Sequence, residues 1–97
     1  MNETAELTGR ELDAAVAEMM GWDGTPYHIS WELSVVWRVV KEMHERGLNL
    51  HLTVYAYGRT YALFATGEPD WDSASEGNGK YATEEAILRA ALKAVEA

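Results

Sequence analysis

The sequence predicts a single α+β domain, in which three helices and a small antiparallel sheet form an α–β–α layered sandwich. Apolar residues recur at helical spacing in three segments, and they alternate with a period of two in a central hairpin. Capping residues and glycines separate these patterns. The chain has 97 residues, 47% of them apolar and 25% charged, so we expect one globular domain over residues 1–97.

The first helix is predicted over residues 8–20. Thr8 and Glu11 have the spacing of a capping box, and Gly21 is placed to end the helix in the left-handed conformation. The apolar residues of its buried side follow at helical spacing and are Leu12, Val16, Met19 and Met20.

The second helix is predicted over residues 31–46. Ser30 is a candidate N-cap, and Gly47 closes the helix. Its apolar stripe consists of Leu33, Val36, Trp37, Val40 and Met43. This stripe places the Trp37 ring in the core.

A β-hairpin is predicted over residues 48–66, because apolar and polar residues alternate there. A two-residue turn at Gly58-Arg59 would put Tyr61 on the face of Leu52 and Val54, and Tyr55 on the opposite face. Two strands alone are marginally stable. We therefore expect a third short strand, within residues 25–29 or within the loop at 67–82, or extension of the sheet through a homodimer.

The third helix is predicted over residues 83–96. Thr83 is a candidate N-cap, and Glu84 and Glu85 follow it at the positive end of the helix. Its buried stripe consists of Ile87, Leu88, Ala91, Leu92 and Val95.

The charge balance excludes some function classes. Eight Lys and Arg stand against sixteen Asp and Glu, for a net charge of −8, which opposes direct nucleic-acid binding. Disulfides and thiolate chemistry are excluded because there is no Cys. No apolar run approaches the roughly 18 residues of a membrane span, and the polar N-terminus does not resemble a signal peptide. A cytoplasmic location is therefore expected.

Three segments resemble the phage ABA sandwich domain family of small phage and prophage proteins. Residues 9–22 (GRELDAAVAEMMGW) resemble its opening helix, residues 26–43 (PYHISWELSVVWRVVKEM) its central segment, and residues 82–95 (ATEEAILRAALKAV) its closing helix. The resemblance covers about half of the chain. It implies an α–β–α fold and a phage origin, in an infected or lysogenic bacterial host, but no catalytic residues.

Catalytic and metal-binding patterns are weak. The histidines His28, His44 and His51 are not spaced to converge on one metal ion, and Ser30 is better explained as a helix cap than as a nucleophile. The sequence therefore predicts a non-enzymatic protein without a metal or cofactor.

The binding hypothesis rests on aromatic and basic residues in the connections. Rings in loops offer rigid stacking surfaces, and cations beside them hold a phosphate. The candidate ligand-binding residues are Trp22, Tyr27, His28, Trp31, Tyr57, Arg59, Trp71, Lys80 and Tyr81.

We expect a homo-oligomer that counters host antiviral defence by sequestering a nucleotide-like signalling ligand. One alternative is an acidic inhibitor of anti-CRISPR or DNA-mimic type, which docks on a basic host defence protein. A virion or replication accessory role is a third option.

Overall fold

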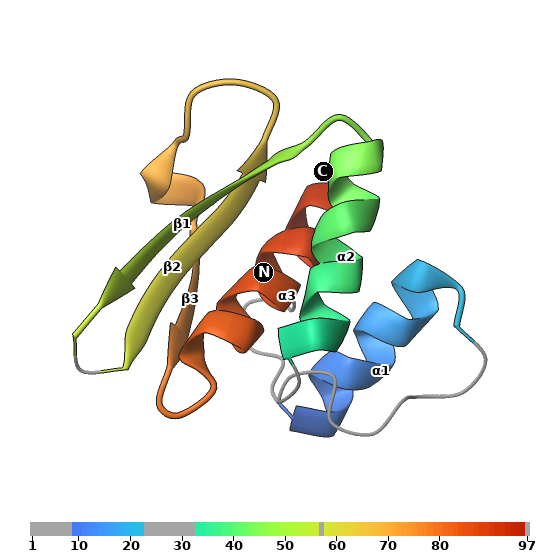
Figure 1. Cartoon of the computed structure of the whole chain (residues 1–97), viewed down its shortest axis with the longest axis horizontal. Helices are drawn as coiled ribbons and strands as arrows, with labels where there is room; N and C mark the ends of the chain where they lie inside the picture. The colour runs from blue at the N-terminus through green and yellow to red at the C-terminus, as the bar shows by residue number, and fades with distance from the viewer. Residues whose placement is uncertain (1–8, 23–32, 57, 97) are drawn as a thin grey trace.

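The computed structural model describes residues 9–22, 33–56 and 58–96, and it confirms the α+β fold class (Figure 1). The strands form one antiparallel sheet in the order β1-β2-β3. In chain order the elements are α1 (Gly9–Met20), α2 (Leu33–Glu45), β1 (Asn49–Tyr55), β2 (Arg59–Ala65), the short 3₁₀ turn η3 (Trp71–Ser73), β3 (Ser75–Asn78) and α3 (Ala82–Glu96).

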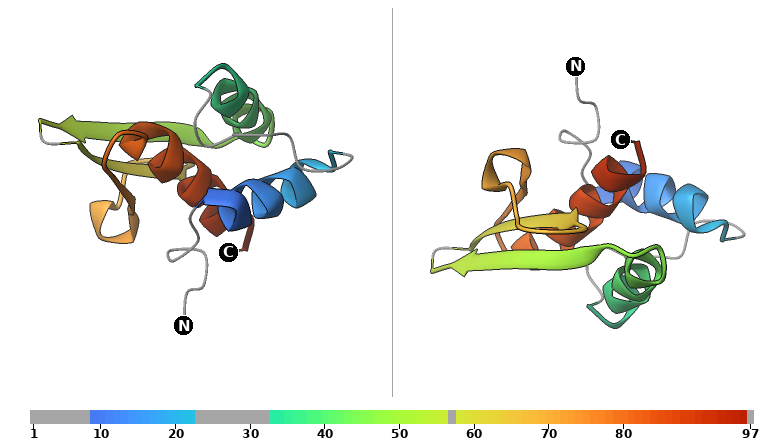
Figure 2. Two further views of the ribbon diagram at one scale, coloured as in Figure 1. Left: turned by 90° about the horizontal axis from the view of Figure 1, so that it is seen from below. Right: turned by 90° about the horizontal axis from the view of Figure 1, so that it is seen from above.

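The helices gather on one side of the sheet (Figures 1 and 2). Helix α3 packs against β2 and β3, α2 lies beside α3 and reaches β1, and α1 packs against α3. The layers therefore run from the sheet through α2 and α3 to α1, rather than having helices on both faces. The other face of the sheet is left for the site described below.

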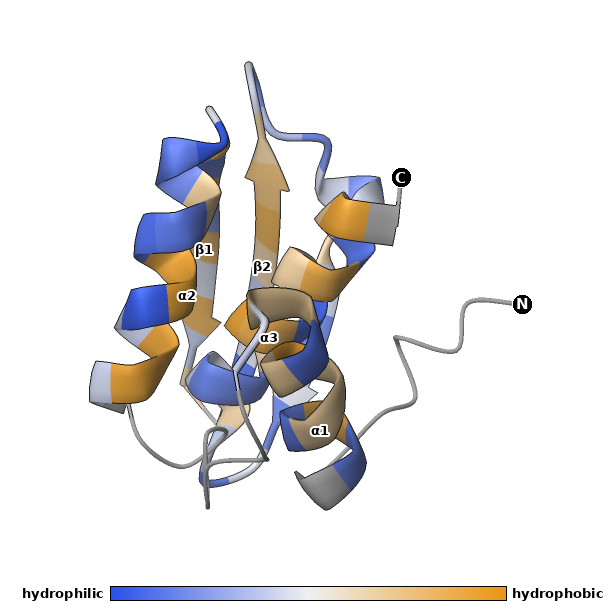
Figure 3. Ribbon diagram, turned by 90° about the vertical axis from the view of Figure 1, so that its right-hand side faces the viewer, coloured by the Kyte–Doolittle hydropathy of each residue, from blue (hydrophilic) through white to orange (hydrophobic). Residues whose placement is uncertain are grey.

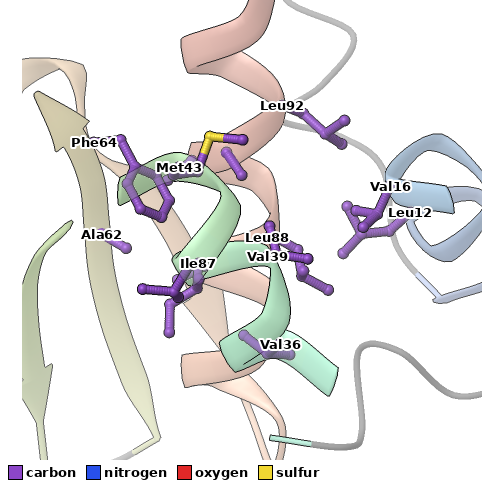
Figure 4. Close-up of a cluster of buried hydrophobic side chains, with 14 of the residues drawn as sticks. Leu12, Val16, Val36, Val39, Met43, Ala62, Phe64, Ile87, Leu88 and Leu92 are labelled. Carbon is purple, nitrogen blue, oxygen red and sulfur yellow. The ribbon is translucent and has the colours of Figure 1, made fainter. Parts of the chain in front are cut away.

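One hydrophobic core joins these layers (Figure 4). Side chains from β2, α2 and α3 meet between the sheet and the helices, and α1 adds its buried side next to α3. The labelled members of this core are Leu12, Val16, Val36, Val39, Met43, Ala62, Phe64, Ile87, Leu88 and Leu92.

Glycines end the first two helices, as predicted. Gly21 and Gly47 have φ of +72° and +85°. The N–H of Gly47 donates to the carbonyl of His44 at 2.9 Å, and the N–H of Leu48 donates to that of Met43 at 3.0 Å. This is the Schellman arrangement, which satisfies helix carbonyls that otherwise lack partners. The predicted caps Thr8 and Ser30, and the first two residues of the predicted helix 31–46, lie outside the described residues.

The prediction that Trp37 belongs to the core is wrong. Its side chain is 49% exposed, whereas Val39 is fully buried. Positions 37 and 39 lie on opposite flanks of the same helical stripe, so the apolar pattern alone did not decide between them. Figure 3 shows the hydrophobic side of α2 turned towards the rest of the molecule and its hydrophilic side turned away. The buried residues of α2 are Val36, Val39, Val40 and Met43.

The predicted two-residue hairpin turn is also wrong. Tyr55 pairs with Arg59, which leaves three residues, 56–58, between the strands. Gly58 has φ of +69°, as expected for the last position of a three-residue loop. A shift of one residue moves every side chain to the other face. Leu52 is therefore paired with Ala62, and Tyr61 lies on the face of Tyr55.

The loop between β2 and α3 contains the third strand, so this form of the third-strand prediction is confirmed. Strand β3 lies so close to α3 that a Cβ on Gly77 would meet the Ala82 carbonyl oxygen at 1.9 Å. Thr83 is not the N-cap, because α3 begins at Ala82. Its Oγ1 instead lies 3.2 Å from the Oγ1 of Thr60, which joins the helix to β2.

Candidate functional site

The register of the sheet defines a second face, opposite the helices. Thr60 and Ala62 are buried beneath α3, so the residues that alternate with them in β2 point the other way. Their neighbours in β1 and β3 follow the same alternation. The central part of this second face carries Thr53, Tyr55, Arg59, Tyr61, Glu76 and Asn78.

An open pocket with a volume of about 700 Å³ lies on this face. This volume is in the range of small-molecule sites, roughly 300–1,000 Å³. All three strands and η3 contribute to its wall, which consists of Thr53, Tyr55, Arg59, Tyr61, Trp71 and Asn78.

Three aromatic rings line the pocket. The rings of Tyr55 and Tyr61 meet edge to face, with centroids 5.8 Å apart and an interplanar angle of 89°. Tyr55 is 55% exposed and Trp71 is 43% exposed, so both offer ring surface to a ligand. Exposed rings of this kind provide rigid contact area at little cost in side-chain entropy.

Trp71 is held by a capped turn. The Asp70 carboxylate accepts hydrogen bonds from the Asp72 N–H at 3.2 Å and from the Ser73 hydroxyl at 3.0 Å. The Lys93 ammonium donates to the Ser73 carbonyl at 2.6 Å, which fastens the turn to α3. These hydrogen bonds therefore fix the position of the turn that carries Trp71.

The charged groups of the site form a small network. Arg59 Nε lies 3.2 Å from Glu76 Oε1 and 3.4 Å from Asn78 Oδ1, and the Tyr61 hydroxyl donates to the same Glu76 oxygen at 3.0 Å. The Arg59 side chain is 57% exposed. Within the described residues, its terminal nitrogens Nη1 and Nη2 make no hydrogen bond. They remain able to bind an anion.

A buried arginine fixes the backbone below this network. Arg89 is only 7% exposed, and its Nη1 donates to the main-chain carbonyl of Glu76 at 2.6 Å. Its Nη2 donates to the Glu85 carboxylate at 2.8 Å. Helix α3 therefore positions Glu76, and through it Arg59 and Tyr61.

Two of the residues predicted from sequence, Arg59 and Trp71, line the pocket. Lys80 and Tyr81 do not line it; the Lys80 ammonium lies 5.4 Å from the Tyr81 ring centroid, in the turn before α3. Trp22 lies two residues beyond the end of α1, and the Arg38 guanidinium stacks over its ring, 5.1 Å from the ring centroid. Tyr27, His28, Trp31 and Tyr57 lie outside the described residues.

The sequence pattern did not identify Tyr55, Tyr61, Glu76 and Asn78 as residues of the site. Tyr55 and Tyr61 were assigned to opposite faces by the wrong turn length, although the register brings them together. Asn78 and Glu76 belong to a strand whose sequence, Ser-Glu-Gly-Asn, has little strand propensity. A three-residue turn that uses Gly58 is the signal that would have placed the two tyrosines on one face.

No family model matches this chain, and searches of curated proteins and of solved structures also find no match. The resemblance to the phage ABA sandwich family therefore stays a prediction. In the parts of the chain that the structure describes, no three His, Asp or Glu side chains are grouped to hold a metal ion. No helix in those parts is long and apolar enough to cross a bilayer.

Proposed function

We propose that this protein binds, without chemical conversion, a small ligand that combines a planar ring with an anionic group, as a nucleotide does. The observation that supports this proposal is the pocket itself. It brings three aromatic rings together with an arginine whose terminal nitrogens have no partner in the described structure. The rings would stack on the base, and the guanidinium would hold the phosphate through paired hydrogen bonds.

Glu76 is compatible with this proposal although it carries a negative charge. It engages Arg59 through Nε, at the side of the guanidinium, and so leaves the outer edge of that group facing solvent. A carboxylate at Nε restricts the orientation of the arginine, which lowers the entropy cost of binding a phosphate. The net charge of −8 still weakens the attraction of any anion at long range.

For the biological role, we propose the sequestration of a nucleotide-like signal of host antiviral defence by a phage protein in a bacterial cytoplasm. The support for this part of the proposal is the resemblance of three segments to a phage family, together with a pocket of suitable chemistry.

The ligand proposal predicts that Arg59→Gln and Trp71→Ala each weaken binding of adenosine and guanosine monophosphate. A lost hydrogen bond to a charged group costs about 1.5–3 kcal/mol, and a lost stacking ring costs about 1–3 kcal/mol. Each change should therefore lower the affinity roughly tenfold to a hundredfold. Isothermal titration calorimetry with both nucleotides measures this loss.

Lys80→Gln is the matched control, because it removes a cation near the same end of the sheet but outside the pocket wall. It should change the affinity less than twofold. Native mass spectrometry of protein from host lysate provides an independent readout of a retained small molecule. Equal loss in the Arg59 and Lys80 variants, or no nucleotide binding by the wild-type protein, would reject the pocket as the site.

The second candidate function is docking of the acidic surface on a basic host effector. It is favoured by three exposed acidic residues near one another in the sequence between β2 and β3, Glu68, Asp70 and Asp72. Charge reversal at Arg59 and Lys80 separates the two functions. It should abolish retention of a nucleotide under the ligand proposal, and it should leave or strengthen binding to a basic protein under the alternative.

A further inference from the structure

Strand β1 is an edge strand without the usual protection. Its residues pair with β2 in an unbroken ladder on one side, and no other described strand pairs with its free side. Natural edge strands are usually protected from pairing with other chains by charged residues, proline or bulges. The strand Asn49–Tyr55, of sequence NLHLTVY, contains no Asp, Glu, Lys, Arg or Pro.

The helix layer covers only the beginning of this strand. On the helix side of β1, Leu50 is half-buried, Leu52 is 38% exposed and Val54 is 61% exposed. Figure 1 shows the reason, because β1 starts next to the end of α2 and then extends away from the helices. An aliphatic stripe is therefore exposed beside a row of backbone groups with which no other described strand pairs.

The charge of the chain indicates what covers this strand. A basic partner would be drawn to the carboxylates of a chain with a net charge of −8, and β1 offers it none. By contrast, an uncharged strand is a place where two acidic copies can meet without placing like charges opposite each other. A second copy is therefore the partner that this edge fits.

The strand is also complementary to itself. In an antiparallel pair centred on Leu52, Leu50 lies opposite Val54 of the second copy, so aliphatic residues face each other on the helix side. On the pocket side, Thr53 lies opposite His51 of the second copy, so polar residues meet there.

We infer that two copies of the chain pair through β1, antiparallel and about a two-fold axis at Leu52. The product is one continuous sheet with three strands from each copy. The interface is isologous, which is the commonest arrangement of soluble dimers.

This pairing would complete the ligand pocket. Thr53 and Tyr55 form the part of its wall that lies on the edge strand, and the second copy would place His51 and Asn49 opposite them. The completed pocket rests on the proposed function, whereas the pairing itself does not.

The test uses the fact that position 52 faces itself across the axis. Light scattering after size exclusion should give twice the chain mass of 10.8 kDa for the wild-type protein. Leu52→Lys and Leu52→Glu should each be monomeric, since they place like charges opposite each other, and their mixture should restore the dimer. Mixing Val54→Lys with Val54→Glu should restore far less dimer, because position 54 lies opposite Leu50 of the second copy and not opposite itself.

A cysteine variant keeps the test decisive if the charged variants fail to fold. The natural chain has no Cys, so the thiol of Leu52→Cys can form a disulfide only with a second copy. The Cα atoms of opposite residues in antiparallel strands lie about 4.5–5.5 Å apart, which is within the Cα–Cα range of a disulfide. Leu52→Cys should form a covalent dimer under mild oxidation. Val95→Cys should not; Val95 is 43% exposed on α3, so its predicted place in the buried stripe of this helix is wrong.

A monomeric wild-type protein, or a Leu52→Lys variant that remains dimeric, would overturn the inference. Nucleotide affinity is measured separately. A monomeric Leu52→Lys protein with full affinity for guanosine and adenosine monophosphate would reject the shared pocket and keep the single-chain site. A β1 dimer that binds neither nucleotide would reject the proposed function and keep the pairing.

Discussion

Among single residues, Arg89 connects the core to the candidate site most directly. Its guanidinium is buried between α3 and β3, where it holds the Glu76 carbonyl and the Glu85 carboxylate. The side chain of Glu76 in turn contacts Arg59 and Tyr61 in the pocket wall. A change at Arg89 should therefore affect both stability and ligand binding, although Arg89 does not touch the pocket.

Arg89→Met should lower the free energy of unfolding by about 3 kcal/mol, because it removes the partner of the largely buried Glu85 carboxylate and of the Glu76 carbonyl. Urea denaturation followed by circular dichroism measures this loss. Lys93→Met is the control, since it removes a cation from the more exposed side of the same helix, and it should cost less than about 1 kcal/mol. Equal losses in the two variants would contradict the structural role assigned to Arg89.

Among the elements, β3 shows how far tertiary packing outweighs local sequence. Its four residues include glycine and asparagine, which strands usually avoid, and yet they pair with β2 and lie against the start of α3. Gly77 allows this contact, because any larger residue would meet the Ala82 carbonyl oxygen and the Ala86 nitrogen. The strand therefore forms because its backbone fits between β2 and the start of α3, where a side chain at position 77 would not fit.

Gly77→Ala should therefore destabilise the fold by about 2–3 kcal/mol, because the strand and the helix must move apart to accommodate the methyl group. Thermal unfolding monitored by circular dichroism measures the effect. Gly67→Ala is the control, since a Cβ at that position meets nothing within 4 Å, and its melting temperature should be close to that of the wild-type protein. A Gly77→Ala melting temperature that is equally unchanged would show that the close approach is easily relieved.

The elements that could be predicted from sequence are those with strong local signals. Helices α1 and α2 end at glycines in Schellman turns, and the hairpin follows a clear two-residue alternation. The hairpin register could not be fixed, because turns of two and of three residues both suit a Gly in this segment. That single uncertainty concealed the contact between Tyr55 and Tyr61, and with it most of the pocket.

For the whole molecule, charge sets the conditions under which the inferred dimer forms. Two copies with a net charge of −8 repel each other, although the strands that meet are uncharged. The dimer dissociation constant should therefore fall as salt is added, because the Debye length shortens to about 10 Å at 0.1 M. Sedimentation equilibrium across a salt series measures this trend.

The mixture of Leu52→Lys and Leu52→Glu is the reference for the salt series. Salt screens the attraction between the opposite charges introduced at position 52 as well as the general repulsion between the copies. The dissociation constant of this mixed dimer should therefore fall less with added salt than that of the wild-type dimer. A wild-type dimer that weakens steadily with salt would indicate an ionic interface, which β1 does not provide.

The division of β2 between two faces has a consequence for how such a protein changes over generations. Thr60, Ala62 and Phe64 hold the helices, whereas Arg59 and Tyr61 face the pocket. Because neighbouring positions serve different faces, mutations that alter what the pocket recognises leave the packing of the core intact. A lineage could thus retarget this scaffold repeatedly by drift at a few exposed codons, while the fold itself persists.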